Sequence, residues 1–353
     1  MNTNSIIGFS QIVSIVCLVL GGAFSGKPSE CRAKDKLNIV TTTTNLKSLA
    51  EAVGGEHVSV FSLAIGSEDP HFVAAKPSYM MKAKNADLWI RVGLDLEIGY
   101  EDLIIAGSRN RRIRVGAPGH LDASAGIQPL EVPSGKVSRA MGDVHPLGNP
   151  HYWLDPYNGR IMAQNICRRL KQLDAEHGGD YDRNLAAFLL KLDSAMFGSK
   201  LVEAVGGEKL WKMQSDDTLD SFLKDQTLSL EGWLAKLKPF ARAKVVTYHR
   251  SWSYFAHRFH LEIVGELEPK PGIPPSPSRV LKVINTMKSE KVGVLLMEPF
   301  YNRADADVVA QKTGAKVIIA AAAVTGQKEA TDYIAMFDNI VTRLSNARSE
   351  VAK

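Results

Sequence analysis

The stretch LNIVTTTTNLKSLAEAVGGEHVSVFSL, residues 37–63, decides the fold of this chain. Residues 37–42 and 58–63 are apolar runs of strand length, and the segment 46–53 between them repeats its apolar residues at helical spacing. A helix that connects two strands in this way is typical of a parallel sheet covered by helices. The stretch therefore predicts an α/β fold.

The same alternation continues on both sides of a long helical section. Apolar residues recur at helical spacing through residues 157–198, with Gly178-Gly179 as the only clear break, and a section of this kind can join two lobes. Further strands are predicted at residues 87–92, from Ile113 to Val115, and at 244–247, 261–265, 292–297 and 315–319.

These patterns divide the chain into six segments. We predict a signal peptide at 1–25, a tether at 26–36, an N-terminal α/β lobe at 37–156, a linking helical section at 157–198, a helical insertion at 199–238 and a C-terminal α/β lobe at 239–353.

The first residues predict export. The apolar run from Ile12 to Leu20 is too short to cross a bilayer of about 30 Å, and Ala23-Phe24-Ser25 after it resembles a cleavage site. No Lys or Arg precedes the run, so an uncleaved anchor is the alternative to a cleaved signal. In an exported chain Cys31 and Cys167 can form a disulfide or stay as free thiols.

Composition and motifs favour binding over catalysis. The net charge is only +5, and the basic cluster at residues 109–114 has no aromatic residues within it, which argues against nucleic acid. The chain lacks the Gly-x-Ser-x-Gly, P-loop, Gly-x-Gly-x-x-Gly and His-Glu-x-x-His motifs.

Three histidines stand where a strand-like run gives way to a loop. His71 lies in Glu68-Asp69-Pro70-His71-Phe72, His151 lies between two prolines in residues 148–156, and His249 ends the apolar run 245–249. In α/β folds ligands bind at such strand ends, and three neutral imidazoles together suit a borderline-soft divalent cation. His145 is a competitor for His151. The remaining histidines are expected on the surface or on helix faces: His57, His120, His177, His257 and His260.

Taken together, these settings resemble the metal-binding substrate-binding proteins of ABC importers, the zinc/manganese group, from about Leu37 to Leu344. The landmarks that carry the resemblance are Asp69-Pro70-His71, Pro77-Ser78, Ala86-Asp87, Gly93-Leu94-Asp95-Leu96-Glu97, residues 149–156, Val246-Thr247-Tyr248-His249, Pro275-Ser276-Pro277-Ser278, Glu298-Pro299 and Thr313-Gly314-Ala315-Lys316-Val317.

The resemblance implies two Rossmann-like lobes joined by a long rigid helix, with the metal held at the lobe interface. His71 and His151 would come from the first lobe and His249 from the second. Many members have an aspartate as fourth ligand where this chain reads Ala320 to Ala323. We predict Glu298 in that position; water, Glu268 or Asp332 are the alternatives.

The function expected from the resemblance is that of a periplasmic or otherwise extracytoplasmic receptor. It would act as a monomer that captures Zn²⁺, in preference to Mn²⁺, and delivers it to an ABC permease in the membrane. Because imidazolium does not bind metal, affinity should fall as the pH drops through roughly 6. The alternatives are an extracytoplasmic zinc metallohydrolase, with Glu68 or Glu298 as base, and a metal-dependent adhesin or chaperone.

Overall fold

The computed structural model of the chain describes residues 36–135, 145–268 and 273–351. The predicted signal peptide, Cys31 and nearly all of the predicted tether lie outside the described residues. Cys167 is buried and its thiol is free. Among the described helices, none combines the length and the apolar character that crossing a membrane requires.

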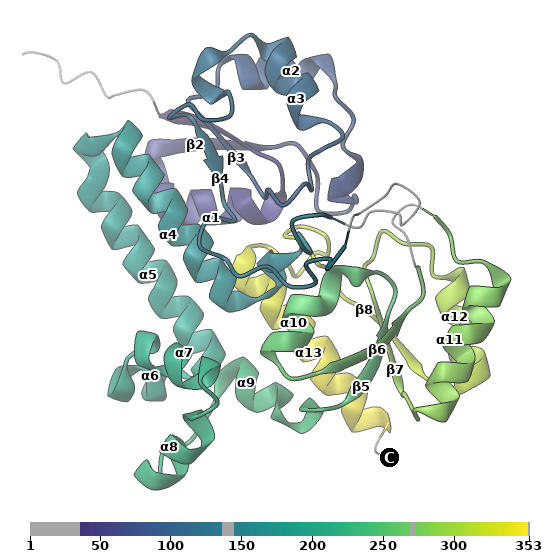
Figure 1. Ribbon diagram of the computed structural model, residues 1–353. Coiled ribbons are helices and arrows are strands. Elements are labelled where there is room, and N and C mark those ends of the chain that lie inside the picture. Colours follow the sequence, from purple (N-terminus) through teal and green to yellow (C-terminus); the bar gives the residue numbers. More distant parts are fainter. Residues whose placement is uncertain (1–35, 136–144, 269–272, 352–353) are drawn as a thin grey trace, which may run out of the picture. The chain divides into compact units, whose positions relative to one another are not determined.

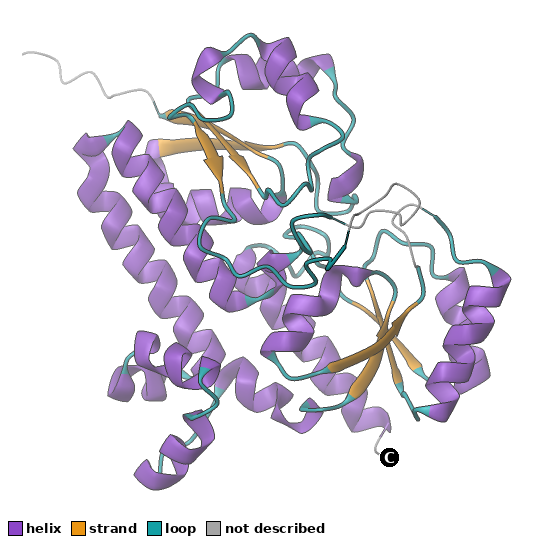
Figure 2. Ribbon diagram, in the orientation of Figure 1, coloured by secondary structure: helices purple, strands orange, loops and turns teal. Residues whose placement is uncertain are grey.

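The N-terminal lobe is built on a four-stranded parallel sheet of order β2-β1-β3-β4. Apolar residues on both faces of its central strands explain why helices cover it on both sides (Figures 1 and 2). The strands are β1 (Leu37–Thr41), β2 (Val58–Ser62), β3 (Leu88–Arg91) and β4 (His120–Asp122), and the helices are α1 (Thr44–Gly54), α2 (Pro77–Lys84) and α3 (Glu101–Ser108).

The C-terminal lobe repeats the plan with a parallel sheet of order β6-β5-β7-β8. All four residues of β7 are buried, as expected for the centre of a parallel sheet. Its strands are β5 (Lys244–Thr247), β6 (Glu262–Glu266), β7 (Val294–Met297) and β8 (Lys316–Ile319), and its helices are α10 (Ser253–Arg258), α11 (Pro277–Ser289), α12 (Ala304–Thr313) and α13 (Tyr333–Val351). The two parallel sheets confirm the predicted fold class.

In the helical link between the sheets we predicted a break at Gly178-Gly179, and the structure places this break a few residues earlier. Helix α4 (Pro156–Leu173) ends at Asp174, whose backbone leaves the helical region at φ −145° and ψ 74°, and α5 (Gly178–Phe197) packs against it (Figure 1). Gly178 and Gly179 therefore begin the second helix and do not form the break. Four short helices follow: α6 (Ser199–Val205), α7 (Gly207–Ser215), α8 (Leu219–Gln226) and α9 (Gly232–Leu237).

Two local expectations were wrong. Residues 111–113 form a 3-10 turn and not a strand, because Val115 is exposed and β3 pairs instead with His120–Asp122. We also expected Ser278 to cap a helix from Arg279 to Ser289. The helix α11 is instead capped by Ser276, since Pro277 occupies the first helical position, where no N–H is needed. The other 3-10 turns are Gly55–His57, Pro70–Phe72, Tyr152–Leu154, Ala175–His177, Lys238–Phe240 and Arg250–Trp252.

The segment after β8 joins the two lobes. The Asn45 side chain at the start of α1 donates to the carbonyl of Ala322 at 3.2 Å and accepts from the Val324 amide at 2.7 Å. Trp153, in the turn after His151, also donates to the Ala322 carbonyl, at 2.8 Å. These contacts hold the carboxyl edge of the second sheet against the carboxyl edge of the first.

Candidate metal centre

His71, His151 and His249 converge between the two sheets. One ring nitrogen from each lies within 4.8 Å of the others, and their ring centroids are 5.0 to 5.9 Å apart. In the described part of the chain these three residues form the one group of histidine, cysteine or acidic side chains close enough to share a cation. His71 lies in the loop after β2 and His249 comes directly after β5, where open parallel sheets place their ligands, whereas His151 comes directly after no described strand.

The first two histidines are held by the same local device. The side chain of Asp69 accepts a hydrogen bond from the His71 amide at 3.0 Å and lies 2.7 Å from its Nδ1. Asn149 does the same for His151, at 2.9 Å and 2.8 Å. In both loops a proline separates the two residues, which favours this tight turn. With Nδ1 engaged, each ring presents Nε2 to the space between the lobes.

His249 is held by carboxylates from the neighbouring strand ends. It follows β5, while Glu268 follows β6 and Glu298 follows β7. Its Nδ1 lies 3.2 Å from a Glu268 oxygen, an ion-pair distance without hydrogen-bond alignment. Burial favours the neutral ring, yet the Glu268 and Glu298 carboxylates raise the pKa of His249. Burial also raises the pKa of Glu298.

Burial also affects the pKa values of His151 and Asp69. Desolvation, helped by the charges on the other histidines, holds the pKa of His151 well below its ordinary value, so this ring is neutral and able to bind metal. Burial opposes ionisation of Asp69, but the hydrogen bonds from His71 and the charges of His71 and His249 together outweigh this effect and lower the Asp69 pKa. The centre thus combines imidazole donors with surrounding negative charge, which attracts a cation.

The residues considered from the sequence as a fourth donor have different surroundings in the structure. Glu298 is fully buried, and in the described structure neither of its oxygens has a hydrogen-bond partner of good geometry. Asp332 accepts from the Ile334 and Ala335 amides and so caps α13. Ala322 and Ala323 line a small cavity beside His151 and supply no side-chain donor there.

From the sequence we expected His145 only as a competitor for His151. Its Nε2 lies 3.3 Å from the Nε2 of His71, and the ring centroids are 5.4 Å apart. The residues around His145 in the sequence indicate only a loop. Its contact with His71 joins positions that lie far apart in the sequence, so no local pattern predicts it.

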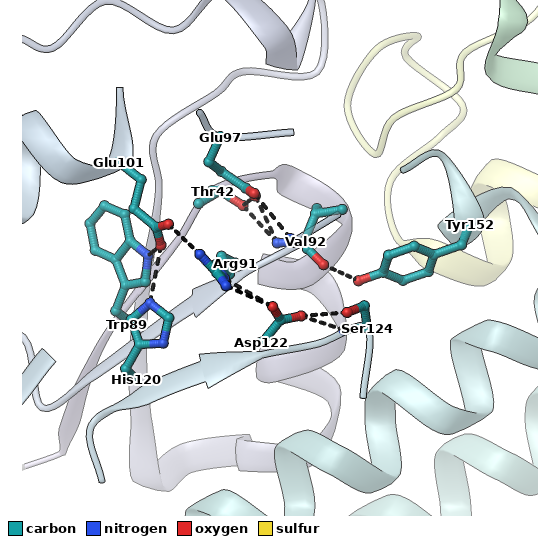
Figure 3. A network of polar contacts seen from close by, with 11 residues as sticks. Thr42, Trp89, Arg91, Val92, Glu97, Glu101, His120, Asp122, Ser124 and Tyr152 are labelled. Carbon is teal, nitrogen blue, oxygen red and sulfur yellow. Dashed lines mark hydrogen bonds and ion pairs between the residues drawn. The ribbon is translucent and has the colours of Figure 1, made fainter. Parts of the chain in front are cut away.

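The expectation for His120 was wrong. This residue is buried on β4 and lies 3.1 Å from Glu101, which also accepts from Trp89 and Arg91 (Figure 3). The acidic partner satisfies the ring in the interior, so His120 belongs to the structure of the first lobe and not to the metal centre.

The turn after β3 supports the loop that contains His151. Glu97 accepts hydrogen bonds from the Val92 and Gly93 amides at 2.7 and 3.0 Å and from the Thr42 hydroxyl at 2.7 Å (Figure 3). The Val92 carbonyl in turn accepts from the hydroxyl of Tyr152 at 2.6 Å. A buried carboxylate in the first lobe therefore fixes the turn that holds the residue next to His151.

Comparison with known proteins agrees with this architecture. The family model described as zinc-uptake complex component A, periplasmic (ZnuA) matches residues 39–196 and 219–347. The iron-binding protein YfeA of Yersinia pestis is 26% identical over 316 residues, covering 88% of this chain and 83% of that protein.

A manganese ABC transporter lipoprotein and a solved structure are also similar to this chain. The manganese ABC transporter substrate-binding lipoprotein scaA of Streptococcus gordonii is 27% identical over 184 residues, or 52% of this chain and 57% of that protein. A crystal structure of ZnuA superimposes with a TM-score of 0.66 at 22% identity, covering 89% of this chain and 99% of that one, and shows the common fold.

Two parallel-sheet lobes in a chain that is matched along most of its length define a substrate-binding protein of metal ABC transporters. The chain belongs to the ZnuA family of periplasmic zinc-uptake components. This class acts outside the cytoplasm and implies a membrane permease as partner. Because the relatives are named for zinc, iron and manganese, the family establishes a divalent metal as the cargo without deciding which one.

Proposed function

We propose that the protein captures Zn²⁺ outside the cytoplasm and delivers it to an ABC permease, with His71, His151 and His249 as ligands. The observation that carries the proposal is the convergence of three ring nitrogens from both lobes within 4.8 Å of one another. Two of the rings are oriented by oxygen acceptors on Nδ1, as metal-binding histidines usually are.

The donor types favour zinc over manganese. Imidazole nitrogen suits zinc, whereas manganese prefers carboxylate, carbonyl and water oxygens. Three acidic residues that contact or influence the histidines, Asp69, Glu268 and Glu298, are not part of the group of converging donors. They supply negative charge around the cation, which compensates for the cost of burying it.

Glu298 remains our sequence-based proposal for a fourth donor. Its carboxyl group is buried without a hydrogen-bond partner of good geometry in the described residues, as expected for an acid whose partner is a cation. Its pKa is influenced by His249, so the two groups are near one another. To bind the metal, its carboxylate would have to approach the three converging nitrogens.

Delivery requires release at a permease, and the contacts between the lobes limit how this occurs. The segment from Ala322 to Val324 is bonded to α1 and to the turn after His151, so we expect only a modest closure when metal binds. We also propose a monomer, exported by the leader at residues 1–25.

The first test is calorimetry of metal-stripped protein with zinc. Replacing His151 by Ala removes a central donor, so we expect zinc affinity to fall by at least two orders of magnitude, more than the 10- to 100-fold typical of residues that only orient a ligand. His257→Ala is the matched control, because His257 is an exposed histidine on α10. An unchanged affinity in His151→Ala would refute the ligand assignment. Hydrolysis of esters or peptides by the zinc-loaded protein would instead favour a metallohydrolase.

A further inference from the structure

A fourth imidazole, that of His145, adjoins the centre. Its Nε2 is 3.3 Å from the Nε2 of His71. In a tetrahedral zinc site with Zn–N bonds of about 2.0–2.1 Å, two ligand nitrogens are separated by about 3.3 Å. The distance between the two rings is therefore the one expected for two ligands of the same zinc ion.

His145 lies next to His71, while the three nitrogens that all lie within 4.8 Å of one another are those of His71, His151 and His249. The centroids of His71 and His145 are 5.4 Å apart, which falls within the 5.0 to 5.9 Å that separates the three central rings from each other. His71 Nδ1 is already taken by Asp69, so its contact with His145 is made by the nitrogen that faces the centre. His145 is half-buried and so partly shielded from water.

The chain that follows His145 is anchored at the lobe interface. The carbonyl of His145 accepts from the Gly148 amide at 3.1 Å, and the Asn149 amide donates to Leu130 at 2.8 Å. Gly148 has φ +106°, and a Cβ there would lie 2.8 Å from the Cβ of Pro129. This turn accordingly holds His145 at a short, defined distance from the His151 loop.

Residues of the same turn also form hydrogen bonds with the second lobe. Glu131 accepts from the Ser253 hydroxyl at 2.8 Å and from the Asn149 amide group at 2.9 Å, and Tyr254 donates to the Asn149 carbonyl at 2.7 Å. Ser253 and Tyr254 begin α10, close in sequence to His249. The loop that carries His145 and His151 is thus tied to the strand end that carries His249.

We propose that the ring of His145 turns from His71 toward the cation when the cation binds and supplies the fourth nitrogen, so that four imidazoles surround it. This inference rests on the proposed function. His145 would take the place of Glu298 as the fourth donor. The centre could then bind zinc although the alanine segment after β8 offers no side-chain donor, and Asp69, Glu268 and Glu298 would balance the charge. Four nitrogen donors make the site specific for zinc against manganese.

The experiment compares metal-stripped full-length variants. Zinc affinity is measured by competition with a chromophoric chelator, manganese affinity by calorimetry, and coordination by the visible spectrum of the Co²⁺ form. His145→Ala and His145→Gln should each weaken zinc binding on the order of 10- to 100-fold. Both should narrow the preference for zinc over manganese and change the intensity of the tetrahedral Co²⁺ bands. His257→Ala again serves as control.

Each outcome has a separate meaning. If His151→Ala abolishes zinc binding while both His145 variants keep the wild-type affinity and Co²⁺ spectrum, the proposed function stands and the role of His145 is refuted. His145 would then only hydrogen-bond to His71. If Glu298→Gln, and not His145→Ala, changes the Co²⁺ spectrum, Glu298 is the fourth ligand. Circular dichroism melting of each variant establishes that it is folded.

Discussion

The two histidine loops of the N-terminal lobe use the same residue-scale device. In Asp69-Pro70-His71 and in Asn149-Pro150-His151, the first side chain accepts from both the amide and the Nδ1 of the histidine. One oxygen thereby fixes the turn and the ring orientation together. Because the histidine then enters the site already ordered, metal binding loses less side-chain entropy.

This device makes Asp69 a positioning residue whose effect can be measured. Asp69→Ala removes the acceptor for His71, so we expect zinc affinity to fall on the order of 10- to 100-fold. Asp69→Asn keeps an acceptor oxygen and should recover most of the affinity. Asp102→Ala, an exposed acid on α3, controls for the loss of a negative charge. Equal zinc affinities for Asp69→Ala and the control would show that His71 needs no such support.

At the scale of elements, the turn after β3 has three consecutive residues in the left-handed region. Gly93, Leu94 and Asp95 all have positive φ, of 82°, 51° and 66°. Such backbone persists only where the surroundings hold it, and the three hydrogen bonds to Glu97 do so here. The carboxylate is fully buried, and this burial raises the pKa of Glu97 to about 7.

The raised pKa predicts a pH-dependent stability. Between the ordinary value of 4.5 and about 7 the folded state holds a proton that the unfolded state has lost. The contribution of Glu97 to stability therefore declines as pH rises through this window, by at most about 3 kcal/mol. Below pH 4.5 both states are protonated, and this pH dependence disappears.

Glu97→Gln isolates this group, because glutamine cannot ionise. Denaturant unfolding of the metal-free protein at pH 5, 6.5 and 8 should show the stability of the wild type falling relative to the variant as pH rises. Glu51→Gln, an exposed glutamate on α1, should leave the difference independent of pH. A flat difference for Glu97→Gln would mean that Glu97 is ionised throughout this range.

A second buried network, formed by Asp155, Arg258 and Gln214, connects three helices near the His151 loop. Asp155 caps α4 through the Tyr157 amide and also receives two hydrogen bonds of 2.8 Å from Arg258 at the end of α10. Gln214 in α7 bonds to Arg258 in turn. Since removal of one partner from a buried ion pair is costly, this network keeps the helices of the link and of the second lobe in register.

For the whole molecule, a close approach of backbone between the lobes depends on Gly66 and Gly326. A Cβ built on Gly66 would lie 2.1 Å from the Val324 carbonyl oxygen and 2.4 Å from the Gly326 amide nitrogen. A side chain at Gly66 would therefore force backbone apart, between the strand end that leads to His71 and the segment after β8. Glycine here permits contact between the two halves of the protein.

Gly66→Ala should separate the lobes and weaken the metal centre. We expect a loss of stability of about 1–3 kcal/mol from overpacking, together with weaker zinc binding as His71 moves from His249. Thermal melting with and without zinc and calorimetry measure the two effects. Gly99→Ala is the matched control, since a Cβ there meets no atom within 4 Å. Identical behaviour of the two variants would contradict the close packing of the lobes.

The sequence by itself determined the two parallel sheets, since strand and helix periodicities are local and strong. It also marked out His71, His151 and His249 as candidates, because proline turns and strand ends have signals within a few residues. It failed for the short strand at His120–Asp122, whose three residues carry too little pattern and depend on pairing with β3.

Only the tertiary structure decided which side chains meet. The approach of His145 to His71, the burial of His120 and the carboxylates behind His249 all follow from packing between segments far apart in the sequence. The division of the helical link into α4 and α5 depends likewise on the packing of one helix on the other. Such distances are set by the sum of many contacts across both lobes, and no stretch of the chain encodes them alone.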